Sequence, residues 1–209
     1  MTIDASMGVT MRFLFPFMVL WLAPVGVFQA GELEQAERTR VLVAYYSETG
    51  HTESMAKAMA AGMATVAGVE VVLRSVGDVS DQEILLADGI LVGTPVHWGS
   101  LSARAKDFLD QVGRVLAEES HGEGRTGGAF CAGGAVSSGK ELARLAILAA
   151  FLNMRFVAVG GLTGDGFGNL GAQATTGAED LGLSAAELDE ARRSGERFAR
   201  ITQAMHQAH

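Results

Sequence analysis

Hydroxyl groups follow directly after an apolar run in the segment Val41-Leu-Val-Ala-Tyr-Tyr-Ser-Glu-Thr-Gly-His-Thr52. Ser47, Thr49 and Thr52 are donors, and Gly50 permits a tight turn. The next residues have a helical composition, so backbone N–H groups and the helix dipole would face an anion bound at this turn. The loop has no Lys or Arg and lacks the spacing of a triphosphate-binding P-loop. We therefore expect it to hold a single phosphomonoester through neutral donors.

The pattern Ser-x-Thr-Gly-x-Thr after a first strand resembles the phosphate loop of flavodoxin-like FMN proteins. The alternative is an ordinary strand–turn–helix junction, in which Ser and Thr only cap the helix. Two further segments help to decide between a phosphate loop and a simple helix cap, because their compositions suit a planar ligand.

The first of these segments is Gly93-Thr-Pro-Val-His-Trp-Gly99. A flavin ring needs apolar or aromatic walls and polar partners along one edge. The alternatives are that Trp98 packs at the base of the loop and that His97 is a solvent-exposed loop residue. The candidate lining residues are Thr94, Pro95, Val96, His97 and Trp98.

The second segment is Ala132-Gly-Gly-Ala135, which has almost no side chains. Bare backbone can approach a planar ligand closely, although the segment is also consistent with a plain glycine-rich turn. The candidates here are Ala132, Gly133, Gly134 and Ala135.

Strand and helix patterns alternate from residue 40 onward, which favours a parallel sheet with helices on both faces. The resemblance implies an α/β, flavodoxin-like, doubly wound five-stranded parallel sheet in the order 2-1-3-4-5. The loops after strands one, three and four would then meet in one crevice at the carboxyl ends of the strands. We expect strands at 41–46, 69–74, 87–93, 127–132 and 154–159, and helices at 53–66, 102–117, 140–152 and from the Ser184 capping box to about 207.

The composition excludes several classes of function. The net charge is −8 and no basic run exceeds a pair, so nucleic acid is not expected as a primary partner. Any dinucleotide site must therefore be locally basic. The single cysteine, Cys131, rules out an internal disulfide framework and a Cys-rich metal site, and its apolar surroundings indicate a small core residue. No metal site is expected.

Residues 12–28 form a nearly unbroken apolar run. Three interpretations stay open: a cleaved signal peptide, an uncleaved membrane anchor, and an upstream start codon wrongly assigned to a cytoplasmic protein. The first two would place the protein in the periplasm or at a membrane. We expect residues 1–39 to be an N-terminal segment with a linker, and residues 40–207 to form the flavodoxin-like domain.

Several segments together resemble the WrbA-type NAD(P)H:quinone oxidoreductases, a branch of the flavodoxin-like FMN proteins. The resemblance implies that Ser47, Thr49, Gly50, His51 and Thr52 hold the FMN phosphate. It also implies that the two later segments surround the flavin and that the protein forms a homo-oligomer, a dimer or a tetramer. The matching segments are 41–62, 93–95, 98–102, 106–111, 138–141 and 171–177.

The expected function is FMN-dependent transfer of a hydride from NAD(P)H to a quinone-like acceptor. One alternative is a flavodoxin-type electron carrier that docks on redox partners. The other is a flavin-free binding protein on the same fold, because a fold does not determine a function. The residues do not identify a general acid or base.

Overall fold

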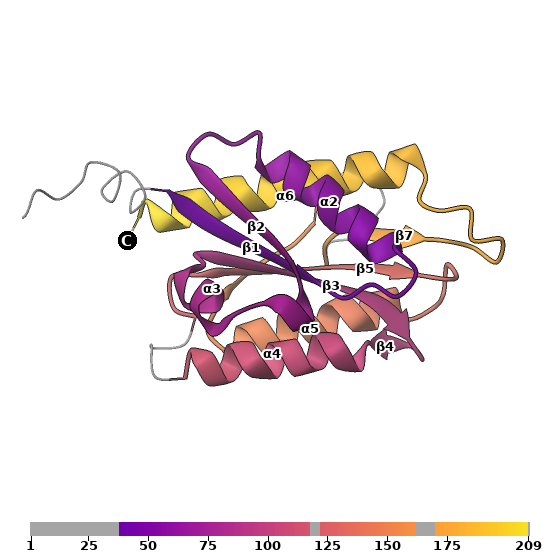
Figure 1. Cartoon of the computed structure of the whole chain (residues 1–209), viewed down its shortest axis with the longest axis horizontal. Helices are drawn as coiled ribbons and strands as arrows, with labels where there is room; N and C mark the ends of the chain where they lie inside the picture. Colours follow the sequence, from indigo (N-terminus) through magenta and orange to yellow (C-terminus); the bar gives the residue numbers. More distant parts are fainter. Residues whose placement is uncertain (1–37, 118–121, 162–169, 209) are drawn as a thin grey trace, which may run out of the picture.

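The computed structural model describes residues 38–117, 122–161 and 170–208, and the described residues form the expected α/β sheet (Figure 1). The central strands run parallel in the order β2-β1-β3-β5-β6, which is the predicted order 2-1-3-4-5. Their bounds are Thr39–Tyr45 for β1, Val69–Ser75 for β2, Gly89–His97 for β3, Thr126–Gly133 for β5 and Val157–Val159 for β6.

Helices cover both faces of the sheet, as expected for a doubly wound fold (Figure 1). On one face lie α2 (His51–Met63) and α6 (Ala185–His206). The other face carries α3 (Asp81–Leu86), α4 (Ala103–Val115) and α5 (Lys140–Asn153), with a short 3-10 turn, η1, at Val76–Asp78.

Strand β1 is apolar on both faces because both faces are covered. Leu42 and Ala44 belong to the core beneath α3, α4 and α5, whereas Val41 and Val43 belong to the core beneath α2 and α6. All four side chains are at most 1% exposed. Strand β1 is therefore held rigidly in the centre of the sheet. The hydroxyl-rich loop follows its carboxyl end, so this loop starts from a fixed position.

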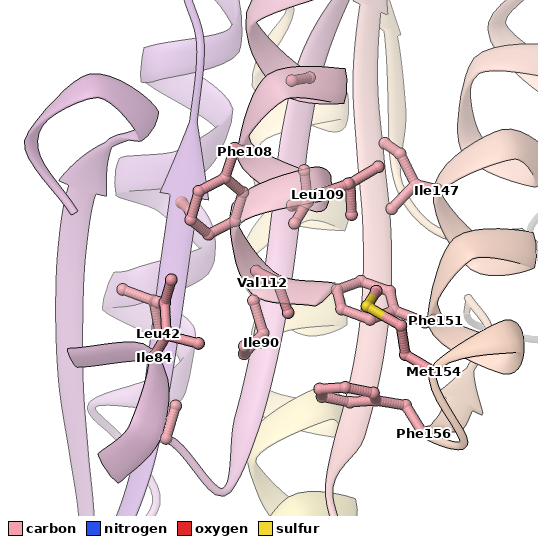
Figure 2. Close-up of a cluster of buried hydrophobic side chains, with 14 of the residues drawn as sticks. Leu42, Ile84, Ile90, Phe108, Leu109, Val112, Ile147, Phe151, Met154 and Phe156 are labelled. Carbon is pink, nitrogen blue, oxygen red and sulfur yellow. The ribbon is translucent and has the colours of Figure 1, made fainter. Parts of the chain in front are cut away.

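In helix α4, apolar residues at helical spacing form one buried face. Phe108, Leu109 and Val112 share one face and are buried against the sheet and α5, where Ile147 and Phe151 meet them (Figure 2). The helix predicted at 102–117 is confirmed, and the burial of three large side chains fixes the rotation of α4. Its opposite face stays in solvent.

Helix α6 begins at the capping box expected from the sequence. The Ser184 hydroxyl accepts a hydrogen bond from the Glu187 N–H at 3.2 Å, and the Glu187 carboxylate accepts one from the Ser184 N–H at 2.9 Å. A second capping box, between Ser80 and Glu83, opens α3. The sequence analysis did not identify this short helix.

The structure corrects three expected boundaries. Residues 93–97 belong to β3 and are not a loop, because β4 (Ser100–Leu101) folds back and pairs antiparallel with the end of β3. Strand β6 begins at Val157 and not at residue 154 as expected, because Arg155, at φ 67°, lies in the turn before it. A further strand, β7 (Gln173–Thr175), lies within the expected glycine-rich connection and pairs with β5.

The apolar run at 12–28 lies outside the described residues, so its three interpretations stay predictions. Within the residues that the structure describes, no helix combines the length and apolarity needed to cross a bilayer. The domain boundary at residue 40 also stays a prediction.

Candidate functional site

The loop between β1 and α2 forms an anion-binding helix start. Gly50 is the N-cap residue of α2 and adopts φ 92°, a left-handed conformation that glycine tolerates. Its N–H donates to the Ser47 hydroxyl oxygen at 3.1 Å, which closes the turn. No side chain caps α2, so the amides of its first turn are left for a ligand.

Thr52 lies in that first turn and is 1% exposed. Among the described residues, its hydroxyl has no hydrogen-bond partner, although it lines the cavity at this edge of the sheet. No protein group in the described chain competes with a ligand for this hydroxyl. Thr52 therefore fits an anionic ligand at the helix start.

Two histidine–carboxylate pairs border the loop. His51, the first residue of α2, places its Nε2 against the carboxylate of Asp180, which lies between β7 and α6. His97, the last residue of β3, places its Nε2 3.2 Å from the Glu48 carboxylate. The first loop is thereby connected to both neighbouring segments.

The end of β3 supplies one side of the cavity. Pro95, Val96 and His97 line it, and all three are partly exposed. Thr94 does not, because its hydroxyl is committed to the chain: it donates to Ser102 Oγ at 3.0 Å and accepts the Ser102 N–H at 2.9 Å. Thr94 therefore holds the β3–β4 hairpin in place.

Trp98 occupies the turn of that hairpin at φ 51° and is fully exposed. It does not line the cavity, and its exposure excludes the alternative that it packs at the base of the loop. Its neighbour in the chain, His97, lines that cavity.

The end of β5 supplies the opposite side. A Cβ at Gly133 would lie 2.3 Å from the Ser138 hydroxyl oxygen and 3.0 Å from the Lys140 side chain. A side chain at this position would therefore require the Ser138 side chain to move. Gly134, by contrast, has open space around its Cα.

The three segments meet in one cavity of about 170 Å³ at the carboxyl edge of the sheet. Of the predicted residues, it brings together ten, whereas Gly50, Thr94, Trp98 and Ala135 lie outside its lining. Glu48 and Thr176 line it without having been predicted. The predicted residues in the lining are Ser47, Thr49, His51, Thr52, Pro95, Val96, His97, Ala132, Gly133 and Gly134.

Thr176 reaches the cavity because β7 pairs with β5. The Thr176 N–H donates to the Gly133 carbonyl at 3.0 Å. A signal for it existed, since Thr176 falls in the segment 171–177 that carried the family resemblance. Glu48 had a positional signal only, as the residue between Ser47 and Thr49.

Buried charges hold β7 in place behind the cavity. Lys140, 3% exposed, donates to the Thr175 hydroxyl, and the Thr175 N–H donates to Glu187 at 2.7 Å. Arg144, 1% exposed, donates to the Gly171 carbonyl and to Gln173. These bonds tie α5 and α6 to β7.

These partners lower the pKa of Glu187. Burial by itself raises the pKa of Glu187, but hydrogen bonds from Thr175 and Ser184, with the Lys140 charge, hold it below its ordinary value. Cys131, buried in β5, is different: burial raises the pKa of its thiol to about 12. The expectation of a core residue at Cys131 is confirmed.

These residues fit a planar ligand with a single phosphate. The α2 start supplies amide donors, the Thr52 hydroxyl is unpaired within the described chain, and the two strand ends supply narrow walls. Within the described ranges, no group of three or more His, Cys, Asp or Glu side chains is placed to hold a metal ion.

Comparisons with known proteins agree with this geometry. NAD(P)H dehydrogenase (quinone) 3 of Rhizobium meliloti (strain 1021) is 34% identical over 200 residues, covering 80% of this chain and 93% of that protein. A flavodoxin of Aquifex aeolicus (strain VF5) is 36% identical over 121 residues, which cover 58% of this chain and 64% of the flavodoxin.

The fold is similar to the crystal structure of the flavodoxin, WrbA-like protein from Agrobacterium tumefaciens, with a TM-score of 0.63 and 22% identity. The similarity covers 80% of this chain and 99% of that one. Residues 38–166 match the family described as NADPH-dependent FMN reductase. The chain therefore belongs to this FMN reductase family.

Proposed function

We propose that the protein transfers a hydride from NAD(P)H, by way of FMN, to a quinone-like acceptor. Family membership makes it an FMN-binding oxidoreductase that uses NAD(P)H. The quinone acceptor is supported by relatives named NAD(P)H dehydrogenase (quinone), 31–34% identical over 80% of the chain. The observation that carries the proposal is the single cavity in which the uncapped start of α2 meets the ends of β3 and β5.

In this proposal the start of α2 binds the phosphate. The first-turn amides and the Thr52 hydroxyl donate to the phosphate oxygens, as charge-assisted hydrogen bonds. The Asp180 carboxylate lies against the imidazole of His51 at the same turn. The loop needs no Lys or Arg, because these donors and the helix dipole supply the positive potential.

The two strand ends orient the ring. Pro95 and Val96 form an apolar wall on the β3 side, and the backbone of Gly133 and Gly134 forms a flat wall on the β5 side. Bound FMN supplies the capacity to accept a hydride and release electrons. The chain contributes binding, orientation and exclusion of water from the phosphate end.

A flavodoxin-type electron carrier is the second candidate function. Two observations favour it: the similarity to the Aquifex flavodoxin, and two carboxylates beside the cavity, Glu48 and Asp180. An acidic rim suits docking on redox proteins. An enzyme needs an open stacking surface for two small substrates, and the exposed Trp98, next to His97 in the chain, would supply one.

Steady-state kinetics separates the two. Purified protein that starts near Glu32 is saturated with FMN and mixed with NADH or NADPH and a benzoquinone. We expect catalytic oxidation of the nicotinamide with two-electron reduction of the quinone. Slow or absent turnover, together with rapid one-electron exchange with a redox protein, would establish the carrier instead.

A further inference from the structure

A second cavity of about 490 Å³ lies between α4 and the end of β2. Tyr46, Val76 and Phe108 give it apolar surface, and Phe108 also belongs to the core in Figure 2. We call it the α4 groove. Its size suits a small organic ligand, and the proposed FMN site makes no use of it.

The α4 groove carries two arginines without partners. Arg104 and Arg114 are exposed and make no ion pair or hydrogen bond with any residue that the structure describes. The neighbouring Lys106 and Asp110, on the same helix, pair with each other at 2.5 Å. The two guanidinium groups are therefore available to a ligand.

Asp107 contributes the one carboxylate in the lining of the α4 groove, so two positive charges and one negative charge leave it with a net charge of +1. The whole chain has a net charge of −8. The groove is thus the kind of locally basic surface that an anionic substrate requires on an acidic protein.

The α4 groove adjoins the cavity of the proposed FMN site, which we call the FMN cavity. The Tyr46 ring contacts the His97 ring edge-on, with centroids 6.1 Å apart and planes at 89°. His97 lines the FMN cavity and Tyr46 lines the groove, so this aromatic pair separates the two. A ligand that passes over the pair would reach both.

The two arginines lie at different distances from the FMN cavity. Arg104 is in the first turn of α4, two residues after Ser102, whose hydroxyl bonds to Thr94 of β3. Arg114 follows ten residues later, which is about 15 Å further along the helix axis. Long helical side chains lean toward the helix N-terminus, which is the end of α4 nearer the FMN cavity.

We propose that the α4 groove binds the adenosine end of NADPH, with Arg104 at the pyrophosphate and Arg114 at the 2′-phosphate, and that the enzyme prefers NADPH to NADH. NADPH differs from NADH by that 2′-phosphate alone. Arginine matches phosphate oxygens with its planar fork of donors, and it is the residue type that accommodates a 2′-phosphate in dinucleotide sites. This inference rests on the proposed function, because it places the nicotinamide in the FMN cavity.

The kinetic test compares Arg114→Ala with a matched control, Arg197→Ala. Arg197 is an exposed arginine on α6, outside the α4 groove. With FMN-loaded protein, we expect Arg114→Ala to lower the ratio of kcat/KM for NADPH to that for NADH by roughly tenfold or more. Arg197→Ala should keep the wild-type ratio, and Asp107→Asn should raise the NADPH value, because a repelling carboxylate is removed.

A binding test does not depend on turnover. Isothermal titration with adenosine 2′,5′-bisphosphate should show binding to the wild type and to Arg197→Ala, and loss of binding in Arg114→Ala. Equal wild-type kcat/KM for the two nucleotides, or an equal loss for both in Arg114→Ala, would overturn the inference. If neither nucleotide reduces the flavin while the bisphosphate still binds, the proposed function fails and the α4 groove remains a phosphate site.

Discussion

At the scale of single residues, the site depends on which hydroxyl groups the backbone leaves free. Thr94 and Thr52 are both buried threonines in the predicted set. The Thr94 hydroxyl is hydrogen-bonded to Ser102, whereas the Thr52 hydroxyl has no partner in the described chain. Identical side chains therefore have different roles, and only Thr52 is placed to serve a ligand.

Thr52→Val should weaken FMN binding more than Thr49→Val, because Thr52 is buried and Thr49 is exposed. Loss of a charge-assisted hydrogen bond costs about 1.5–3 kcal/mol, so we expect at least a tenfold rise in Kd for Thr52→Val. Fluorescence titration of the apoprotein measures it. Thr65→Val, two residues beyond the end of α2, is the control; an unchanged Kd for Thr52→Val would show that the phosphate binds elsewhere.

Trp98→Ala should leave stability unchanged, since the side chain is fully exposed and surface substitutions stay within about 0.5 kcal/mol. If the indole is a stacking surface, its loss removes aromatic contact worth about 0.5–1.5 kcal/mol. We expect a higher KM for the quinone with FMN retained. Melting temperature and Michaelis parameters on one preparation check this, and unchanged kinetics would leave Trp98 without a stacking role.

At the scale of elements, the site is held by strand ends and helix starts, and β7 is the element that depends most on side chains. It has three residues and pairs only with β5 within the described chain. Lys140 and Arg144 of α5 anchor it from one direction and Glu187 of α6 from another. Thr176 reaches the FMN cavity because of these anchors.

Glu187→Ala should destabilise the fold by about 1–3 kcal/mol, because the Thr175 N–H and the start of α6 both lose their acceptor. The pKa of Glu187 is lower in the folded protein, so its stabilisation is present above the unfolded pKa. It is lost as the pH falls through the folded pKa.

Urea unfolding at several pH values tests this. The wild type should lose more stability on acidification below pH ~4.5 than the variant does. Equal acid sensitivity in the two proteins would show that Glu187 is not the group responsible.

At the scale of the whole molecule, the fold brings distant segments to one edge. The loop after β1, the end of β3, the end of β5 and the residue after β7 all meet there (Figure 1). Parallel strands make this possible, because every carboxyl end points the same way. The α4 groove lies beside this edge because α4 starts where β3 and β4 end.

FMN should stabilise the whole domain, since only the folded chain assembles the cavity. At a free concentration of 100 times Kd, the expected gain is about 2.7 kcal/mol, or a rise in Tm of roughly 5–10 °C. Riboflavin, which lacks the phosphate, should give a much smaller shift. Differential scanning fluorimetry with both ligands measures it, and equal shifts would argue against a phosphate-binding first loop.

Local patterns predicted much of the fold. The apolar run at 41–46, the stripe of α4 and the capping box at Ser184 each record a short-range rule: a strand buried on both faces, helical periodicity, and the satisfaction of free N–H groups. The hydroxyl-rich turn after β1 belongs with them, since a helix start binds anions wherever it occurs.

Tertiary contacts decided the rest. Residues 173–175 are a strand because β5, some forty residues earlier, offers an open ladder, and residues 93–97 continue β3 because β4 pairs back on them. The same contacts use up the Thr94 hydroxyl, expose Trp98 and bring Thr176 and Glu48 to the cavity. The sequence shows which polar groups are present near a ligand site. Which of them stay free to bind a ligand depends on contacts with residues distant in the chain, and only the tertiary structure determines those contacts.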